Sequence, residues 1–236
     1  MRKLIFGILA AMLAVILLAA CAVAEKDPVT GCPVVTLGGW QTDTAFTDSN
    51  GGRDPIEWLV LTNDGKKALL LSRYILTDTN FNYVYGNASG KDWAKCTLRK
   101  WLNGDFFANA FTKDEQKAIL QTQIKNPAGP ETKTKGAGSK DKVFLLSYDE
   151  LLQYLPAQEQ RAASRTAFAD AALHKSAEGS VSPVSWWLRT PGMNNGRALL
   201  VDTDGSVELR NGEVILQPRG VRPAIWVDVK KAPLPE

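Results

Sequence analysis

The chain has 236 residues, with 28 basic and 25 acidic side chains and a formal net charge of +3. Without Arg2 and Lys3, which head an apolar N-terminal run, 26 basic and 25 acidic residues remain and the charge is +1. A nearly neutral domain without any basic run lacks the long-range field that attracts nucleic acid, so we expect no nucleic-acid partner. The remaining ~210 residues are enough for a single domain with a sizeable core.

The first 24 residues are typical of an export signal, in which a basic head precedes the apolar run 4–20. The residues Leu18-Ala19-Ala20-Cys21 resemble a bacterial lipobox, in which Cys21 becomes the lipidated first residue. Ordinary cleavage after residue 24 also fits, and so does an uncleaved anchor, because the run approaches the ~20 residues that span a bilayer. All three predict an extracytoplasmic domain that meets a membrane only through an N-terminal lipid or signal anchor. We expect an arm at 25–32, one α+β domain at 33–230 and a tail at 231–236.

Two cysteines, Cys32 and Cys96, follow Cys21. An even count in an oxidising compartment predicts either a disulfide that ties the arm to the middle of the domain or two unpaired buried thiols. Two isolated cysteines and the single histidine, His174, do not make a metal site. We therefore expect neither a metal nor a cofactor, and His174, beside a lysine in an alanine-rich segment, is a poor candidate for a general base.

Ile56–Leu61 and Lys67–Ser72 flank the turn Asn63-Asp64-Gly65 and predict a hairpin. The segment 78–93 is irregular and polar but carries several aromatic residues. Three of them, Tyr83, Tyr85 and Trp93, are candidate ligand contacts, because aromatic rings on a loop stack on the apolar face of a sugar. The alternative is that the aromatic residues of this segment plug the domain.

Short helices are predicted in the middle of the chain. Capping-box patterns begin at Thr112, for a helix to about residue 122, and at Ser147, for a helix that ends at Pro156. The other predicted elements are a helix at 97–102 capped by Thr97, a polar loop at 126–142, a strand at 143–146 and an alanine-rich helix at 157–174.

The C-terminal third predicts antiparallel strands. Asp204-Gly205 and Asn211-Gly212 have the form of two-residue hairpin turns. The first sets Leu200 opposite Leu209, and the second sets Arg210 opposite Glu213. The predicted apolar face consists of Leu200, Val207, Leu209, Val214 and Leu216. Residues 220–229 alternate as a single strand, with Pro223 at an edge or a bulge.

Adjacent strand residues face opposite sides, so Trp186 is expected in the core and Trp187 toward a loop or cleft, or the reverse. Arg189 and Arg222 are expected to brace the sheet by pairing with a carboxylate or with loop carbonyls. The polar loop 190–197 between two strands is the second candidate binding surface. Its candidate contacts are Asn194, Asn195 and Arg197, and Trp187 is included with them.

The phrases IEWLVL, GKKALLLSRYIL, CTLRKWLNGDFF, DKVFLLSYDE, WWLRTPG and GVRPAIWV occur in this order. Together they resemble a bacterial family of exported domains of unknown function, over about residues 34–229. More distantly, the WWLR segment, the hairpins and the terminal G-x-R strand are similar to the C-type-lectin-like fold of formylglycine-generating enzymes. The resemblance implies small twisted antiparallel sheets, several short helices and loops that present a binding surface. It implies no activity, and no cysteine follows Cys96 to supply the reactive pair of those enzymes.

Two functions are compatible with these features. The first is a non-catalytic module, displayed at the bacterial cell surface, that binds a glycan or a cell-surface protein through the aromatic segment and the loop 190–197. The second is an extracellular enzyme that acts on sugar or peptide, with Asp92, Asp202 or Glu208 in acid/base roles. The enzyme requires two carboxylates that converge in a cleft, roughly 5–10 Å apart.

Overall fold

The computed structural model describes residues 25–41, 53–83, 92–132, 135–169, 183–194, 196–210, 217–232 and 234. Several predicted features lie outside the described residues: the export signal with Cys21, Tyr85, residues 170–182 with His174, Asn195, and the turn at Asn211-Gly212. In the described part, twelve strands in small sheets combine with a few short helices. The predicted α+β fold class is therefore confirmed.

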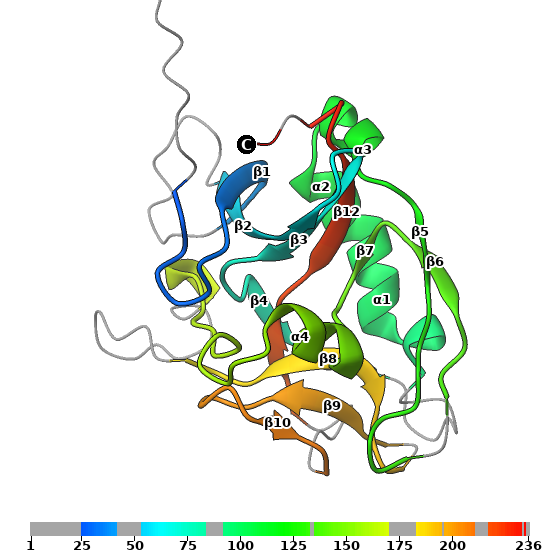
Figure 1. Cartoon of the computed structure of the whole chain (residues 1–236). Coiled ribbons are helices and arrows are strands. Elements are labelled where there is room, and N and C mark those ends of the chain that lie inside the picture. The colour runs from blue at the N-terminus through cyan, green and yellow to red at the C-terminus, as the bar shows by residue number, and fades with distance from the viewer. Residues whose placement is uncertain are drawn as a thin grey trace, which may run out of the picture.

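The first sheet has five strands in the order β1-β2-β3-β12-β7 and lies in the upper half of Figure 1. Its members are β1 (Val34–Trp40), β2 (Asp54–Asn63), β3 (Lys67–Ser72), β12 (Ala224–Asp228) and β7 (Val143–Phe144). Strands β2 and β3 form the predicted hairpin, and Gly65 has the φ of 79° that its tight turn requires. Ile56, Trp58 and Leu70 of this hairpin are fully buried, so it forms one wall of the core.

The second sheet has the order β10-β9-β8-β11-β4 and lies in the lower half of Figure 1. Its members are β10 (Val207–Glu208), β9 (Ala198–Val201), β8 (Trp186–Pro191), β11 (Arg219–Val221) and β4 (Thr77–Thr79). Every residue of β8 and β9 is buried, so both faces of these two strands are covered. Helix α4 (Tyr148–Tyr154) packs against β8.

The C-terminal segment 220–229 is not the single strand that its alternation predicts. Strand β11 ends at Val221 in the second sheet, and β12 begins at Ala224 in the first. Pro223 between them has no N–H to donate to a ladder, and its carbonyl accepts from Ser72 N–H at 2.9 Å. The chain therefore changes sheets at Arg222-Pro223, and β12 is an interior strand between β3 and β7 rather than an edge.

The Asp204-Gly205 hairpin has a longer turn than the sequence predicts. Leu200 pairs with Glu208 instead of Leu209. Gly205 has a φ of 83°, and its N–H donates to the Asp202 carbonyl at 2.9 Å. This geometry is a three-residue loop that ends in a left-handed glycine, a common alternative to the two-residue turn. The shift of one residue turns each side chain of β10 to the face opposite to the predicted one.

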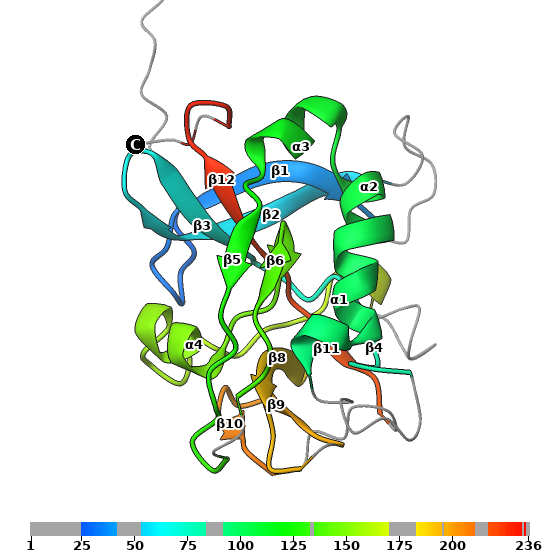
Figure 2. The same ribbon diagram turned by 90° about the vertical axis from the view of Figure 1, so that its right-hand side faces the viewer.

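A helical run stands beside both sheets, as Figure 2 shows. It consists of the 3₁₀ turn η1 (Trp93–Lys95), α1 (Thr97–Trp101), the π-helical η2 (Leu102–Phe106) and α2 (Phe107–Ala110), and it is followed by α3 (Lys113–Ala118). Two fully buried side chains of this run, Leu102 and Phe106, join the core cluster. The run therefore positions η1 and α1 next to the second sheet and α3 next to the first.

The local capping predictions are largely confirmed. Thr112 and Ser147 each accept from the backbone three residues later, and the glutamate there returns the bond, so both capping boxes are present. Helix α1 differs, because its N-cap is Cys96, whose Sγ accepts from Arg99 N–H at 3.4 Å. The predicted Thr97 cap is wrong because the hydroxyl of Thr97 has a different partner, in a cleft described below.

Two stretches of the middle region differ from their predictions. Strands β5 (Thr122–Ile124) and β6 (Ser139–Asp141) form a ladder within the stretch where the sequence predicts a helix end and a polar loop. Of the helix predicted at 157–174, residues 157–165 form turns and bridges instead, whereas residues 167–169 are helical. Arg161 Nε donates to the Leu155 carbonyl at 2.7 Å, and Arg165 forms a β-bridge with Ile75. These tertiary bonds outweigh the helix propensity of the alanines.

Candidate functional site

An open cleft of about 440 Å³ lies where strand β4 approaches helix α1. Its lining consists of Thr77, Asp78, Thr79, Tyr83, Thr97, Leu98 and Trp101. Tyr83 is 63 % exposed, so this candidate ligand contact of the aromatic segment lies at a surface. The cleft therefore combines aromatic rings, which the sequence nominates as sugar contacts, with threonine hydroxyl groups.

Tyr83 is bonded at both its backbone and its ring. Its N–H donates to Thr97 Oγ1 at 3.1 Å, and its hydroxyl hydrogen-bonds to Thr79 Oγ1. Thr97 therefore orders the segment that carries Tyr83 instead of capping α1. An exposed aromatic ring that is ordered before binding loses little conformational entropy when a ligand covers it.

Trp101 supplies a second aromatic surface to the cleft lining. Its ring packs edge-on against Trp40, with ring centroids 5.9 Å apart, and tilted against Phe106 at 5.4 Å. Trp101 remains half-buried despite these contacts. Because the neighbouring rings hold the indole, its exposed part is a rigid apolar surface.

Asp78 is the carboxylate of the cleft lining, and Arg165 occupies both of its oxygens. Arg165 Nε donates to one oxygen at 3.1 Å, and Nη2 donates to the other. The two side chains are only 8 % and 5 % exposed. This fork-to-fork geometry is typical of a structural pair, so Asp78 orders the wall of the cleft rather than standing ready to exchange protons.

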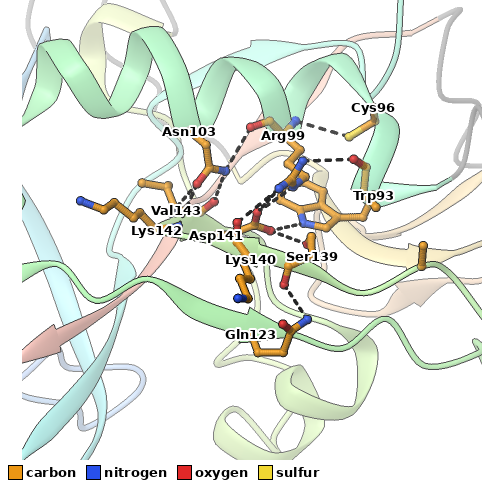
Figure 3. A network of polar contacts seen from close by, with 12 residues as sticks. Trp93, Cys96, Arg99, Asn103, Gln123, Ser139, Lys140, Asp141, Lys142 and Val143 are labelled. Atoms are coloured by element: carbon orange, nitrogen blue, oxygen red, sulfur yellow. Dashed lines mark hydrogen bonds and ion pairs between the residues drawn. The ribbon is translucent and has the colours of Figure 1, made fainter.

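A second polar cluster surrounds Asp141, which is fully buried between α1 and the β5-β6 ladder (Figure 3). One carboxylate oxygen accepts from Arg99 Nε at 2.6 Å. The other accepts from Trp93 Nε1 at 2.8 Å and from Ser139 Oγ at 2.7 Å. Because every carboxylate oxygen has a partner inside the protein, this cluster holds the ladder against the helix and offers no site to a ligand.

The structure contradicts two of the candidate ligand contacts. Trp93 is fully buried, and its indole N–H is bonded to Asp141. Trp187 is also fully buried, and its indole N–H donates to the Thr79 carbonyl at 2.8 Å. Its neighbour Trp186 is buried as well, because both faces of β8 are covered. Alternation correctly turns the two rings to opposite sides, but it does not show that both sides are interior.

Arg189 has the bracing role that the sequence predicts. Its guanidinium lies 2 % exposed and donates to both carboxylate oxygens of Glu150, one of them at 2.8 Å. It also donates to the carbonyls of Leu145 and Lys125. The pair therefore connects β8 to α4 and to the segment that follows β5.

Arg222 is a brace with fewer partners. Its Nε donates to the Ser72 carbonyl at 2.8 Å, and its guanidinium lies over the Trp186 ring at 5.1 Å from the centroid. Its Nη1 is buried without a hydrogen-bond partner in the described part of the chain. Burial lowers the pKa of Arg222 to about 10, which still leaves it protonated at neutral pH.

The loop 190–197 is bonded mainly to itself and to its neighbour. Asn194 is exposed, its Oδ1 accepts from Gly196 N–H at 3.0 Å, and its carbonyl accepts from Arg197 N–H at 3.2 Å. The Arg197 guanidinium donates to the Arg210 carbonyl. Asn194 and Arg197 therefore belong to a loop held by its own backbone bonds, and neither residue lines the cleft at Tyr83.

The three carboxylates nominated for acid/base roles have backbone partners. Asp92 caps η1 and accepts from Ala137 N–H at 3.2 Å. Asp202 accepts from Thr203 N–H at 2.7 Å, and Glu208 accepts from Arg210 N–H at 2.7 Å. Asp92 stabilises the start of η1, whereas Asp202 and Glu208 both lie on the β9-β10 hairpin, where each accepts from a backbone N–H close in sequence.

The two cysteines of the described chain are both free thiols. Cys96 is buried at the start of α1, whereas Cys32 is half-buried in the arm, where its Sγ lies 4.0 Å from the Thr30 carbonyl oxygen. Burial raises the pKa of the Cys96 thiol to about 12. The predicted disulfide is therefore absent, and both thiols are unpaired as the alternative predicts, but only Cys96 is buried.

No cluster of three or more histidine, cysteine, aspartate or glutamate residues suited to a metal ion occurs among the residues that the structure describes. Within the same residues, no helix has the length and apolar character to cross a membrane.

Residues 65–229 match a protein-family model described as "Domain of unknown function (DUF6273)". The chain belongs to this family. The match covers the whole second sheet, strands β3, β7 and β12 of the first sheet, and the whole cleft at Tyr83 and Trp101. No curated protein and no solved structure matches the chain. Membership in the DUF6273 family therefore agrees with the predicted resemblance to a family of unknown function, and the likeness to the C-type-lectin-like fold stays a prediction.

Several residues of the cleft escape sequence reasoning. Trp101 lies in a predicted helix, where a tryptophan is most simply interpreted as a core residue. Thr77 and Thr79 lie in a strand of three residues, which is too short to show an alternating pattern. A usable signal is the Thr-Asp-Thr pattern at 77–79, which places two hydroxyls on one side of an extended segment a few residues before an exposed aromatic. What the sequence cannot show is that α1 lies against this segment.

Proposed function

We propose that the chain is an extracytoplasmic, non-catalytic binding module whose ligand is a carbohydrate seated in the cleft of Tyr83 and Trp101. The observation that carries the proposal is the exposed Tyr83 ring, which is 63 % exposed and yet bonded to two threonines of the same cleft. A large exposed aromatic side chain that is held in one position is characteristic of a contact surface rather than of a mobile tip.

Carbohydrate is the ligand class that the lining supports best. The apolar face of a pyranose ring stacks on aromatic side chains, and its hydroxyls exchange hydrogen bonds with threonine hydroxyls and backbone groups. The cleft offers both kinds of contact from Tyr83, Trp101, Thr77 and Thr79. Its carboxylate is already bound to Arg165, so a neutral ligand suits it better than a cationic one.

The proposal is tested by titrating the domain from Glu25 onward with neutral oligosaccharides on an array, followed by calorimetry with each hit. Replacing Tyr83 with Ala should weaken binding about tenfold, because the loss of one stacked ring costs roughly 1–1.5 kcal/mol. Met193→Ala is the matched control, since Met193 is 49 % exposed on the loop 190–197 and does not line the cleft. Equal effects of the two substitutions, or no oligosaccharide bound at all, would refute the proposal.

The same titrations address the catalytic alternative. Release of new reducing ends from a bound oligosaccharide would identify the chain as an enzyme. We expect none, because Asp78, the carboxylate of the cleft lining, has both oxygens bonded to Arg165.

Export is part of the proposal and rests on the basic head and apolar run of residues 1–24. We propose that Cys21 carries a lipid that anchors the domain outside the cytoplasm. Cys21→Ser should move the protein from the membrane fraction to the soluble fraction of a bacterial host. Unchanged partition would exclude lipid attachment and leave the two other interpretations of the leader.

A further inference from the structure

A groove of about 590 Å³ runs along the outer edge of strand β1. It is lined by four consecutive residues of that strand, Val34, Val35, Thr36 and Leu37. Side chains alternate between the two faces of a strand, so a groove that touches four residues in a row follows the edge where the backbone groups lie. Strand β1 is the terminal strand of the first sheet, so β2 pairs with one edge of β1, and the groove follows the opposite edge.

The backbone of Thr36 points into this groove. Val60 N–H donates to the Pro33 carbonyl at 2.9 Å, which sets the alternation of the β1-β2 ladder. In such a ladder Val35 bonds to β2, whereas the N–H and C=O groups of Val34 and Thr36 point away from it. The Val34 N–H confirms this direction, because it donates to the Glu25 carbonyl of the arm at 2.7 Å.

The arm and helix α3 enclose the stretch of this edge that is left unpaired among the residues that the structure describes. Glu25 bonds to Val34 at one end, and at the other end Gly38 N–H donates to Glu115 Oε1 at 2.8 Å. Figure 2 shows α3 above β1 at the top of the molecule. Ala118, Ala232 and Leu234 complete the lining with apolar surface. The groove therefore has the shape of a short slot for one extended segment.

The charge around the slot is acidic. Glu25, Glu57, Asp114 and Glu115 line it, against Lys231. The ion pairs of these lining residues bring in two further cations, Arg73 and Lys117, and two further carboxylates, Asp27 and Asp228. The lining residues and their ion-pair partners together comprise six carboxylates and three cations. An excess of negative charge around an open strand edge favours a basic partner.

We propose that this slot binds a basic peptide segment in extended conformation, which adds to the first sheet as a strand beside β1. The main-chain groups of Thr36 hydrogen-bond to the peptide backbone, and alternate basic side chains of the peptide face the carboxylates of the rim. Strand addition to an open edge obtains its affinity from such main-chain bonds and its specificity from the flanking side chains. The proposal concerns a surface separate from the cleft at Tyr83 and does not depend on a carbohydrate ligand.

The probe is a fluorescent octapeptide of alternating lysine and valine, titrated against the domain from Glu25 onward, with a glutamate-valine peptide of equal length as the control. Thr36→Pro removes the N–H that faces the slot while leaving the β1-β2 ladder bonds in place, because those bonds belong to Val35. Thr36→Val keeps the N–H and is the matched control. We expect Thr36→Pro to weaken binding about tenfold and Thr36→Val to leave it unchanged.

A second variant keeps the test valid if Thr36→Pro does not fold. Neutralising two rim carboxylates with Glu25→Gln and Asp114→Asn should weaken the lysine-valine peptide and flatten its salt dependence, since both side chains are well exposed. The proposal is overturned if the lysine-valine peptide does not bind, if the glutamate-valine peptide binds equally well, or if Thr36→Pro and Thr36→Val behave alike. Dimerisation that Thr36→Pro abolishes, without peptide binding, would also overturn it and assign the edge to a second copy of the chain.

Discussion

Arg189 is the most heavily bonded charged side chain of the second sheet. It is 2 % exposed and donates to Glu150, Leu145 and Lys125. Such a residue is costly to bury and still more costly to remove, because its partners lose their bonds inside the protein. The exposed pair of Arg210 with Glu131 has a similar two-bond geometry at 3.0 and 3.1 Å but lies in solvent.

Arg189→Met should lower the free energy of unfolding by about 3–5 kcal/mol, because Glu150 loses its cationic partner and the carbonyls of Leu145 and Lys125 lose their guanidinium donor. Arg210→Met, the matched control, should change it by less than about 1 kcal/mol, since solvent replaces the lost contact. Urea unfolding followed by tryptophan fluorescence measures both. Similar losses for the two variants would show that burial does not set the strength of the Arg189 pair.

Asp27 couples the N-terminal arm to Arg73, directly after β3, and makes stability depend on pH. Burial by itself raises its pKa, but hydrogen bonds from Thr30 and Val29 and the charge of Arg73 outweigh burial, so the pKa lies below its ordinary value of 3.8. A lowered folded-state pKa contributes stability above the ordinary value, and this contribution is lost as the pH falls through the folded-state pKa. The ionised Asp27 therefore stabilises the fold at neutral pH and ceases to do so in acid.

Asp27→Asn should reduce stability at neutral pH and reduce the acid-induced loss of stability between about pH 5 and pH 2. Thr30→Val should act in the same direction but less strongly, because it removes the 2.9 Å hydroxyl bond and leaves the backbone bonds. Urea unfolding at a series of pH values provides the measurement. If the free energy of unfolding of Asp27→Asn falls in acid as steeply as that of the unsubstituted protein, other carboxylates are responsible for the pH dependence.

At the scale of the element, the turn of the β9-β10 hairpin depends on Gly205. Its φ of 83° lies in the left-handed region, and a Cβ there would overlap the Gln158 carbonyl oxygen. Gly65 has nearly the same φ, 79°, but a Cβ there would meet no atom within 4 Å. Substitutions at these two glycines therefore distinguish the energetic cost of backbone strain from the cost of steric overlap.

Gly205→Ala should destabilise the domain by about 3 kcal/mol, because strain and collision with the Gln158 backbone combine. Gly65→Ala should cost only about 1 kcal/mol, the strain alone. Thermal unfolding of the two variants compares them directly. An equal loss at both sites would mean that the segment 157–162 moves aside freely and does not pack on the hairpin.

Element prediction succeeds where the determining contacts are local. The capping boxes at Thr112 and Ser147 and the hairpin of β2 and β3 depend on residues that are close in sequence, and the structure contains them. The register of β9 and β10 fails by one residue, because Asp-Gly fits both two-residue and three-residue turns. The prediction of a helix at 157–165 fails because one partner of this segment, Ile75, is distant in the chain, although the other, Leu155, is near.

At the scale of the whole molecule, the two five-stranded sheets share one core. The chain passes directly from one sheet to the other between β11 and β12, and this short connection holds the two sheets together. Alternation in 220–229 predicts strand structure but contains no information about which sheet each half joins. The candidate site likewise depends on contacts between segments whose proximity the sequence does not reveal. Tyr83 can be nominated from its sequence context, but the neighbourhood of Trp101 and Thr79 arises only when α1 and β4 meet.

The central claim, that the cleft of Tyr83 and Trp101 is the ligand site, is tested most directly by the indole N–H signals of the seven tryptophans in an NMR titration with a bound oligosaccharide. Only Trp101 lines the cleft, whereas Trp58, Trp93, Trp186 and Trp187 are fully buried. The account predicts that the signal of Trp101, assigned from Trp101→Phe, shifts with saturation while the signals of Trp58, Trp93 and Trp186 remain in place; Trp187 is no reference, because its indole N–H is bonded to the Thr79 carbonyl of the cleft lining. Saturation of binding without a shift at Trp101 would place the ligand elsewhere and contradict the account.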